Sequence, residues 1–288
     1  MEKAPTQHSI DAAFELARDC QLCPRRCRVD RLVDEHGFCG IGSVPRVASA
    51  FAHFGEESVL VGKGGSGTIF FGGCNLKCVF CQNAVISHQR EGDPITSDEI
   101  AGVMMRLQKA GCENINFVTP SHIVPWLMQA VRLARLEGVE LPVIYNSGGY
   151  ESVDTLRLLE GIVDIYMPDA KYWNAAPAKR FSDAPDYPAV MCTALREMHR
   201  QVGDLHVRHG RATRGLLIRH LVMPNDVAGS RQILDFIAND ISPNSHVNVM
   251  DQYRPCYQAF HYPQIAQPLD AEAYRDVCAY ARQQGLNL

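Results

Sequence analysis

The sequence predicts an α/β fold built around a parallel sheet. Six short segments rich in β-branched and aromatic residues alternate with five segments of helical periodicity. Alternating strands and helices are joined by right-handed crossovers, which leave the strands parallel. The chain has 288 residues, of which 46% are hydrophobic, and this is enough to fill the core of one α/β barrel.

The expected elements follow one another at short intervals. Strands are expected at residues 67–71, 114–118, 142–146, 163–167, 215–222 and 246–250. Helices are expected at residues 9–19, 97–109, 122–136, 152–160, 188–201 and 230–239.

Two segments stand outside this alternation. Residues 201–214 interrupt the fourth crossover, and His209-Gly210 is a candidate hairpin turn within them. Residues 1–60 form an N-terminal extension, whereas residues 61–288 form the domain of strands and helices and end in a C-terminal helix. We therefore expect two structural parts of unequal size.

The N-terminal extension carries a cysteine motif of its own. Cys20, Cys23, Cys27 and Cys39 are spaced C-x2-C-x3-C-x11-C in a polar, arginine-rich segment. Four soft ligands in a short segment suit a structural zinc site or a second, four-cysteine iron–sulfur cluster. The neighbouring arginines favour thiolates in both cases and do not choose the metal. Four free cysteines in a helical hairpin are the alternative without a metal.

A second cysteine motif directly follows the first expected strand. Cys74, Cys78 and Cys81 are spaced C-x3-C-x2-C, at a carboxyl strand end, where α/β folds place their active sites. Three thiolates hold three corners of a cubane iron–sulfur cluster and leave the fourth iron open. Because clusters that only transfer electrons normally have protein ligands on every iron, an open iron indicates chemistry at the cluster.

The segment around these cysteines resembles a known superfamily. The cysteine spacing, Phe80 before the third cysteine and the Gly72-Gly73 lead-in are similar to the radical S-adenosylmethionine (SAM) superfamily, and the likeness extends over residues 64–255; the longer run from Gly65 to Asn83 carries the resemblance to a subgroup. Within it the chain resembles uncharacterised relatives of pyruvate formate-lyase activating enzyme. The resemblance implies a partial, open (β/α)6 barrel with a [4Fe-4S] cluster and SAM at the carboxyl ends of the strands. Phe80 and Asn83 then flank both cofactors.

The resemblance also implies contacts to SAM at the second strand end. The activating enzymes carry a glutamate there that receives the methionyl amino group, but this chain has Thr119-Pro120-Ser121-His122. The hydroxyls of Thr119 and Ser121 can accept hydrogen bonds from an ammonium group. Ser121 alone is equally well explained as a helix N-cap.

The third and fourth strand ends match the family more closely. Asn146 and Ser147, and then Asp169 and Lys171, stand where the activating enzymes bind SAM and a monovalent cation. Together with the Met167 carbonyl they offer the oxygen ligands that such a cation prefers. An ordinary ion pair between Asp169 and Lys171 is the alternative.

The last two strands supply the remaining candidates. Arg219 lies in an apolar strand, and a cation that points into a barrel is costly unless an anion meets it. The resemblance implies that this anion is the carboxylate of SAM. By the same resemblance Met250 and Tyr253 lie beside the adenine, although plain core packing also explains Met250.

These features predict an enzyme that cleaves SAM reductively to a 5′-deoxyadenosyl radical, which abstracts a hydrogen atom from a substrate. By resemblance the leading substrate is a glycyl residue on a loop of a partner enzyme, and the reductant is a low-potential donor of the flavodoxin or ferredoxin type. Radical modification of a small metabolite or of another macromolecule is an alternative. A non-catalytic iron–sulfur electron carrier or scaffold is another.

Composition limits the setting in which this chemistry takes place. A net charge of −4 does not favour nucleic acid as a partner. The first eight residues contain no apolar core of signal-peptide length, and no apolar run reaches the ~20 residues that cross a bilayer. Eleven cysteines without a secretory signal indicate metal ligands in a reducing compartment. We therefore expect a cytoplasmic enzyme with no membrane partner.

Overall fold

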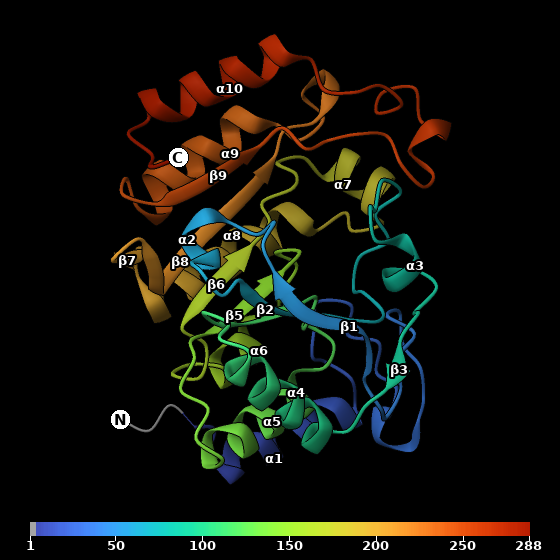
Figure 1. Cartoon of the computed structure of the whole chain (residues 1–288). Coiled ribbons are helices and arrows are strands. Elements are labelled where there is room, and N and C mark those ends of the chain that lie inside the picture. Colours follow the sequence, from blue (N-terminus) through green and yellow to red (C-terminus); the bar gives the residue numbers. More distant parts are fainter. Residues whose placement is uncertain (1–3) are drawn as a thin grey trace.

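The computed structural model describes residues 4–288, and its core is a curved sheet of six parallel strands (Figure 1). These strands are β2 (Ser66–Phe71), β4 (Ile115–Val118), β5 (Val143–Ser147), β6 (Ile165–Pro168), β8 (Arg211–Leu221) and β9 (His246–Met250). All six expected strands are therefore confirmed, as is the α/β class.

Most of the helices lie on the outside of the curved sheet (Figure 1), and the short α2 is an exception. They are α1 (Gln7–Arg18), α2 (Ser58–Val61), α3 (Ala84–Ser87), α4 (Ser97–Lys109), α5 (Val124–Leu136), α6 (Val153–Leu158), α7 (Ala175–Ser182), α8 (Tyr187–Val202), α9 (Ser230–Phe236) and α10 (Ala271–Gln283). A π-helical turn, Ile237–Ile241, continues α9. The expected helices are confirmed to within two or three residues at most ends. Within residues 4–288 no helix is both long and apolar enough to cross a membrane.

The sheet does not close into a full barrel. At one edge β1 (Arg46–His53) pairs antiparallel with β2 and also with the short β3 (Asp93–Pro94). At the other edge β9 pairs with β8, and within the described part of the chain no ladder joins β9 to β1. The open partial barrel expected from the resemblance is therefore present.

The crossover before β8 contains the expected hairpin. β7 (His206–Arg208) pairs antiparallel with the start of β8. The two turn residues, His209 and Gly210, have positive φ values of 52° and 76°. This is the backbone pattern of a two-residue type I′ turn, whose twist matches that of the flanking strands.

The interior of the barrel is filled at the amino ends of the strands. Leu60 of α2 packs inside the sheet against Ile144, Leu217 and their neighbours. The side chain of Asn114 donates a hydrogen bond of 2.7 Å to the Leu60 carbonyl and holds α2 in place. With this end closed, the free space in the barrel lies at the carboxyl ends of the strands.

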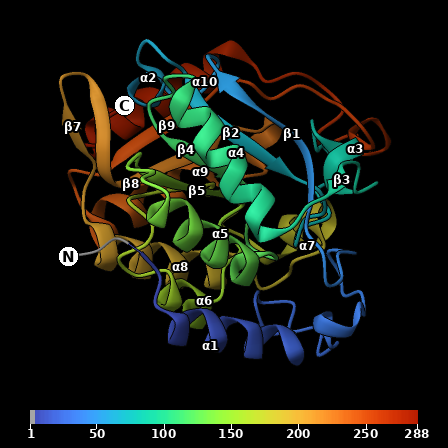
Figure 2. The same ribbon diagram turned by 60° about the horizontal axis from the view of Figure 1, so that its bottom comes forward.

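The N-terminal extension packs against the barrel. Helix α1 contacts α5 and α6 and adds a further layer outside them (Figure 2). Arg25 then reaches the barrel loops, where its guanidinium donates to the carbonyls of Asn75 and Asp183 at 2.8 and 2.5 Å. The division at residue 60 remains a prediction, because the extension and the barrel share these contacts.

Gly149 allows the turn after β5 to approach the end of β6 closely. Gly149 has φ +74°, and a Cβ atom there would lie 2.1 Å from the carbonyl oxygen of Asp169. Any side chain would therefore push the end of β5 away from the end of β6. This close approach matters because both strand ends carry candidate site residues.

Replacing Gly149 by alanine is expected to destabilise the protein far more than the matched change Gly161→Ala. Gly161 has a similar φ of +79° but open space around the added carbon, so its replacement should cost only about 1 kcal/mol. Gly149→Ala adds the backbone clash and should cost about 3 kcal/mol or more. Urea unfolding of both variants measures the difference, and equal losses of stability would contradict the steric argument.

Candidate active site

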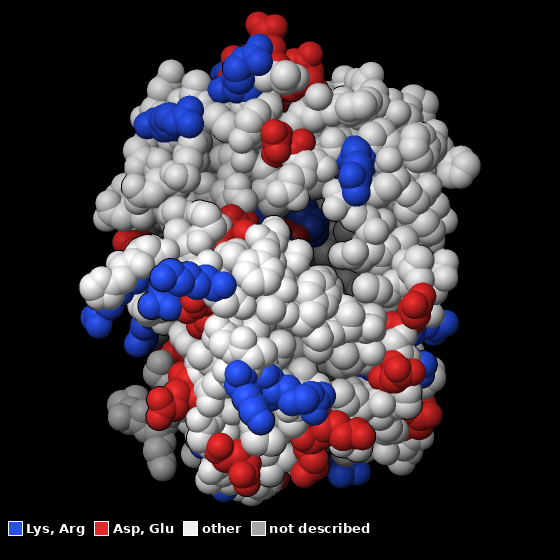
Figure 3. All heavy atoms as spheres, viewed as in Figure 1, with Lys and Arg blue, Asp and Glu red and all other residues white. Residues whose placement is uncertain are grey.

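A cavity of about 280 Å³ lies at the carboxyl ends of the parallel strands. It opens as a hollow in the face of the molecule shown in Figure 3, with basic side chains lying deep inside it. Its walls bring together nearly all of the candidate residues. They are Cys74, Cys78, Phe80, Cys81, Asn83, Thr119, Asn146, Ser147, Asp169, Lys171, Arg219, Met250 and Tyr253.

Ser121 is the candidate that does not line this cavity. Its side chain is 1% exposed, and its hydroxyl donates a 2.5 Å hydrogen bond to the carboxylate of Glu151. Thr119 does face the cavity, and its backbone has a φ of 60°. Left-handed backbone is uncommon for a β-branched residue and marks a locally strained strand end.

Each of the three cavity cysteines has a polar neighbour within reach of its sulfur. The amide of Leu76 donates to Cys74 Sγ at 3.4 Å, and the hydroxyl of Ser182 donates to Cys78 Sγ at 3.0 Å. Ser87 Oγ lies 3.1 Å from Cys81 Sγ. Hydrogen bonds to sulfur are one of the means by which proteins tune iron–sulfur clusters.

Burial makes these cysteines poor thiolates when no metal is bound. It raises the pKa of Cys74 to about 12. Burial also raises the pKa of Cys78, and the ammonium group of Lys171 partly opposes this. A metal centre that binds these sulfurs must therefore displace their protons, as thiolate ligation requires.

The three cysteines offer the donor type and the C-x3-C-x2-C sequence spacing of a cluster-binding motif. Within residues 4–288 no three Cys, His, Asp or Glu side chains converge closely enough to hold one metal ion. A cubane spreads its thiolates over separate irons, so its ligands lie further apart than those of a single ion. The donor type, the spacing and the adjoining cavity together fit an iron–sulfur cluster.

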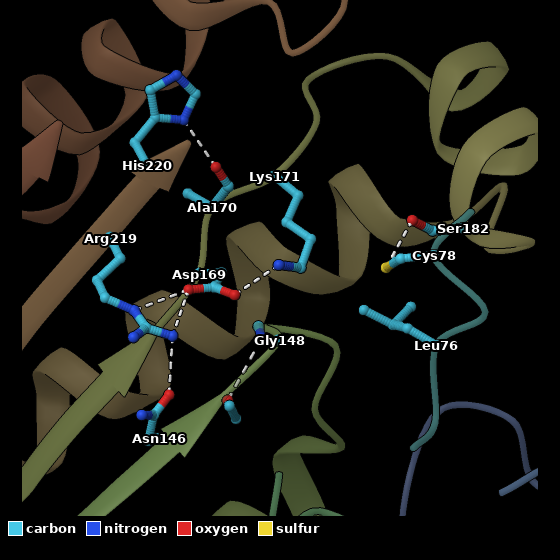
Figure 4. A network of polar contacts seen from close by, with 12 residues as sticks. Leu76, Cys78, Asn146, Gly148, Asp169, Ala170, Lys171, Ser182, Arg219 and His220 are labelled. Carbon is cyan, nitrogen blue, oxygen red and sulfur yellow. Dashed lines mark hydrogen bonds and ion pairs between the residues drawn. The ribbon is translucent and has the colours of Figure 1, made fainter. Parts of the chain in front are cut away.

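On the facing wall, one carboxylate holds two cations. Asp169 accepts hydrogen bonds from Arg219 Nε at 2.9 Å and from Lys171 Nζ at 2.5 Å (Figure 4). Burial alone would raise the pKa of Asp169, but Arg219 and Lys171 outweigh it and lower the pKa below its ordinary value. Figure 4 also shows Cys78 across an open space from this group.

The oxygens expected to bind a monovalent cation already have cationic partners. The side-chain oxygen of Asn146 accepts a 2.8 Å hydrogen bond from Arg219, and both oxygens of Asp169 are occupied as described. A cation at this position would compete with Arg219 and Lys171 for the same acceptors.

Two glutamates from the segment before α2 also enter this region, and the sequence pattern did not reveal them. Glu56 lies 3.7 Å from the guanidinium of Arg219 and accepts a 2.9 Å hydrogen bond from Asn116. Glu57 accepts from the Asn248 side chain at 2.7 Å. Burial raises the pKa of Glu57, although the Asn248 amide lowers it in part. Because they lie outside any strand-end motif, no spacing signal identifies them.

Tyr187 is a further residue that sequence reasoning missed. Its hydroxyl lies 2.8 Å from the carbonyls of both Gly148 and Asp169 and accepts a hydrogen bond from the amide of Lys171. It joins the ends of β5 and β6 from the start of α8. The tyrosine thus positions the strand ends without facing the cavity.

Behind the cavity wall lies a buried glutamate. Glu151 is 2% exposed and accepts hydrogen bonds from Ser121 and, at 3.0 Å, from the Tyr145 hydroxyl. Burial raises its pKa to about 7, although both hydroxyls act in the opposite direction. Its protonation state therefore changes near neutral pH.

The stability of the protein is expected to fall between about pH 5 and pH 7 because of Glu151. In this range the unfolded chain has released the proton while the folded protein retains it, so folding becomes less favourable until both states are ionised. The difference between an ordinary glutamate pKa of 4.5 and a value of about 7 corresponds to on the order of 3 kcal/mol. Urea unfolding at several pH values should show this slope in the parent protein and not in Glu151→Gln. Parallel pH profiles for the two proteins would contradict the assignment.

The four cysteines of the extension also lie near one another. Cys20, Cys23 and Cys39 are each less than 8% exposed. Burial is the main cause that raises the pKa of Cys39, and the charges of Cys20 and Cys27 raise it further, so these thiols are within electrostatic reach of each other. The metal, zinc or iron–sulfur, remains a prediction at this point.

Comparisons with known proteins agree with this geometry. Residues 68–200 match the model of the radical SAM superfamily. An uncharacterized protein of Methanocaldococcus jannaschii is 34% identical over 287 residues, which cover 97% of this chain and 79% of that protein. Its likeness therefore includes the extension as well as the barrel.

Two solved structures share the fold. A radical SAM methyltransferase from Sphaerobacter thermophilus superposes with a TM-score of 0.54 and 16% identity, covering 77% of this chain and 65% of the methyltransferase. HydG, a maturase of the [FeFe]-hydrogenase, superposes with a TM-score of 0.50 and 13% identity, covering 74% of this chain and 47% of HydG. This chain thus spans less than two thirds of either protein, and at these identities the likeness concerns the fold alone. From the matched superfamily, the full-length relative and the barrel geometry we conclude that the chain belongs to the radical SAM superfamily.

Proposed function

We propose that the protein cleaves SAM reductively and that Cys74, Cys78 and Cys81 hold the cluster at which this occurs. One observation carries the proposal: the three thiols and the group of Asp169, Lys171 and Arg219 line the same cavity, and Figure 4 shows Cys78 across from this group. When bound, the cluster and SAM supply reductive radical chemistry. An electron carrier needs no such charged group beside its cluster.

The charged group has a role in binding the methionine part of SAM. Lys171 and Arg219 retain N–H groups beyond those donated to Asp169, and two such cations suit a carboxylate. Asp169 neutralises one of the two positive charges and Glu56, 3.7 Å from Arg219, offsets part of the second, so the two cations would hold a carboxylate chiefly through hydrogen bonds from their remaining N–H groups. The monovalent cation stays a prediction. To bind here, it would have to displace the Lys171 ammonium group from the Asp169 carboxylate.

The opposite side of the cavity is suited to the adenine. Tyr253 packs against Phe80 with ring centroids 5.9 Å apart, and its hydroxyl donates to the Ile265 carbonyl at 2.5 Å. Met250 and Asn83 line the same cavity. We assign the aromatic pair and Met250 to packing around the base, and Thr119 to a contact with the amino group.

Anaerobically reconstituted protein is expected to form 5′-deoxyadenosine from SAM in the presence of dithionite. Cys78→Ala removes a cluster ligand and should abolish this product, which chromatography measures. Cys192→Ala is the matched control, because this partly buried cysteine lies on α8 outside the cavity. Full activity of the Cys78 variant would refute the assignment of the ligands.

The hydroxyl of Ser182 is expected to make the cluster easier to reduce. It donates to Cys78 Sγ, and such a bond strengthens as the cluster gains negative charge. A hydrogen bond contributes about 1 kcal/mol, so Ser182→Ala should lower the potential of this one-electron couple by on the order of 40 mV. A redox titration followed by electron paramagnetic resonance (EPR) measures the potential.

The control for this experiment is Tyr172→Phe. It removes the hydroxyl 2.9 Å from Ser182 Oγ and leaves Ser182 free to donate to sulfur. A smaller change is expected than for Ser182→Ala. Equal potentials in the parent protein and Ser182→Ala would show that this hydrogen bond does not tune the cluster.

The substrate that we propose is a glycyl residue on a loop of a partner enzyme. Besides the resemblance to activating enzymes, the open side of the sheet supports this, because a peptide can enter there. Phe51 of β1, which is 42% exposed, stacks on Phe70, and Phe70 lines the cavity. Figure 3 shows few charged side chains over this part of the surface, below the hollow.

A glycyl radical has a recognisable EPR doublet, which decides this part of the proposal. The doublet should appear when a candidate partner is mixed with this protein, SAM and a reductant of the flavodoxin or ferredoxin type. Deoxyadenosine formation without a doublet would leave SAM cleavage intact and point to a metabolite or another macromolecule as substrate.

Calorimetry tests the alternative that the protein is a non-catalytic scaffold. If it detects no SAM binding, the scaffold is indicated. A cytoplasmic location remains part of the proposal, because free cysteines and a cluster held by thiolates persist in a reducing compartment.

A further inference from the structure

The cysteine motif of the extension lies directly behind the loop of the cavity cysteines. A Cβ atom on Gly73 would lie 2.9 Å from the carbonyl oxygen of Cys39, and Gly73 immediately precedes Cys74. Arg25, two residues after Cys23, donates to the carbonyl of Asn75. The segments that carry the two cysteine motifs are therefore in direct contact.

A buried cation beside this motif lacks an anionic partner. Arg31 is 0% exposed, and its guanidinium donates to the carbonyls of Gly42 and His122 and lies 5.1 Å from the ring of Trp126. Among residues 4–288 no carboxylate forms a salt bridge with it. Burying a charge without a counter-charge is costly. The acceptor Gly42 lies three residues after Cys39, so the guanidinium sits against the loop that carries this cysteine, and a thiolate of the motif would supply the missing anion.

The motif provides sulfur ligands that are enclosed and hydrogen-bonded. Cys27 Sγ accepts a 3.2 Å hydrogen bond from the amide of Phe38. A Cβ atom on Gly37 would lie 2.8 Å from the same sulfur, so only glycine leaves room for it. A hydrogen bond from a backbone amide to the sulfur stabilises a ligating thiolate and is one of the contacts that tune iron–sulfur clusters.

The spacing of the thiols distinguishes between the possible metals. Tetrahedral zinc draws four sulfurs around one ion, with each bond about 2.3 Å long. No such convergence is present in the described part of the chain, here or at Cys74, Cys78 and Cys81. Neither motif therefore has its sulfurs drawn around one ion, and the motif of Cys74, Cys78 and Cys81 belongs to a superfamily defined by iron–sulfur chemistry.

We propose that Cys20, Cys23, Cys27 and Cys39 bind a second [4Fe-4S] cluster, whose negative charge is balanced by Arg31. All four irons then carry protein ligands, so this centre accepts and releases single electrons and does not bind substrate. The electron comes from a low-potential one-electron donor, here dithionite, which is oxidised as the cluster is reduced. The inference does not depend on SAM cleavage or on the identity of the substrate.

The experiment separates the two clusters by mutation in the full chain. In the variant Cys74→Ala/Cys78→Ala/Cys81→Ala, anaerobic reconstitution should leave about four irons and four sulfides per chain and no zinc. Dithionite should then produce the EPR signal of one reduced cluster. The parent protein should contain about twice as much iron, and its reduced spectrum should be broader than that of the triple variant because the two spins lie close together.

A second pair of variants tests the role of Arg31 in the triple-variant background. Arg31→Met removes the balancing charge and should lower the iron content at least several-fold, whereas Arg31→Lys keeps the charge and should retain most of it. Circular dichroism checks that each variant is folded.

Three results would overturn the proposal. They are one zinc per chain in the triple variant, no metal there despite a folded protein, and a parent spectrum equal to the sum of two isolated clusters. None of these depends on deoxyadenosine formation. The outcome is thus distinguishable from a failure of the proposed function.

Discussion

The shared carboxylate of Asp169 is the interaction on which the candidate site depends. Asp169 directly follows β6, and its partners Arg219 and Lys171 come from β8 and from the same segment after β6. Burying three charges in one place has a large desolvation cost, which only good hydrogen-bond geometry offsets. The site therefore requires the ends of β5, β6 and β8 to be held at fixed separations.

Several features of the fold maintain those separations. Gly149 allows the turn after β5 to reach the backbone of Asp169, and the hydroxyl of Tyr187 joins the same two strand ends. Glu56 approaches Arg219 from the segment that leads into α2. Residues far apart in sequence thus share one electrostatic arrangement, and the mostly parallel sheet brings them to the same edge.

Much of this arrangement was predictable, since it depends on local patterns. Buried strands are short apolar runs, and the first cysteine motif after a strand identifies the reactive edge, so all six parallel strands and most cavity residues could be named in advance. Strand β1 was missed because its alternation is weak: alanines occupy many positions, and most of its side chains are only partly buried.

Long-range polar contacts were harder to predict. Ser182 and Glu56 reach the site from a helix end and from a connecting segment, and neither has a sequence signal beyond its polarity. Ser121 was expected at the cavity, but Glu151 from the next crossover holds its hydroxyl behind the wall. Pairing between side chains on different crossovers depends on packing distances that a linear pattern does not contain.

The contacts of Arg25 have a consequence for how the protein is made. Its partners, the carbonyls of Asn75 and Asp183, belong to segments that the ribosome synthesises long after the extension. Until Asp183 has emerged, the arginine lacks one of its acceptors and the cysteines beside it lack the barrel surface that covers them. The sulfurs made first are therefore left unshielded from oxidants until well over half of the chain has been made, and a nascent chain depends on a reducing environment for that time.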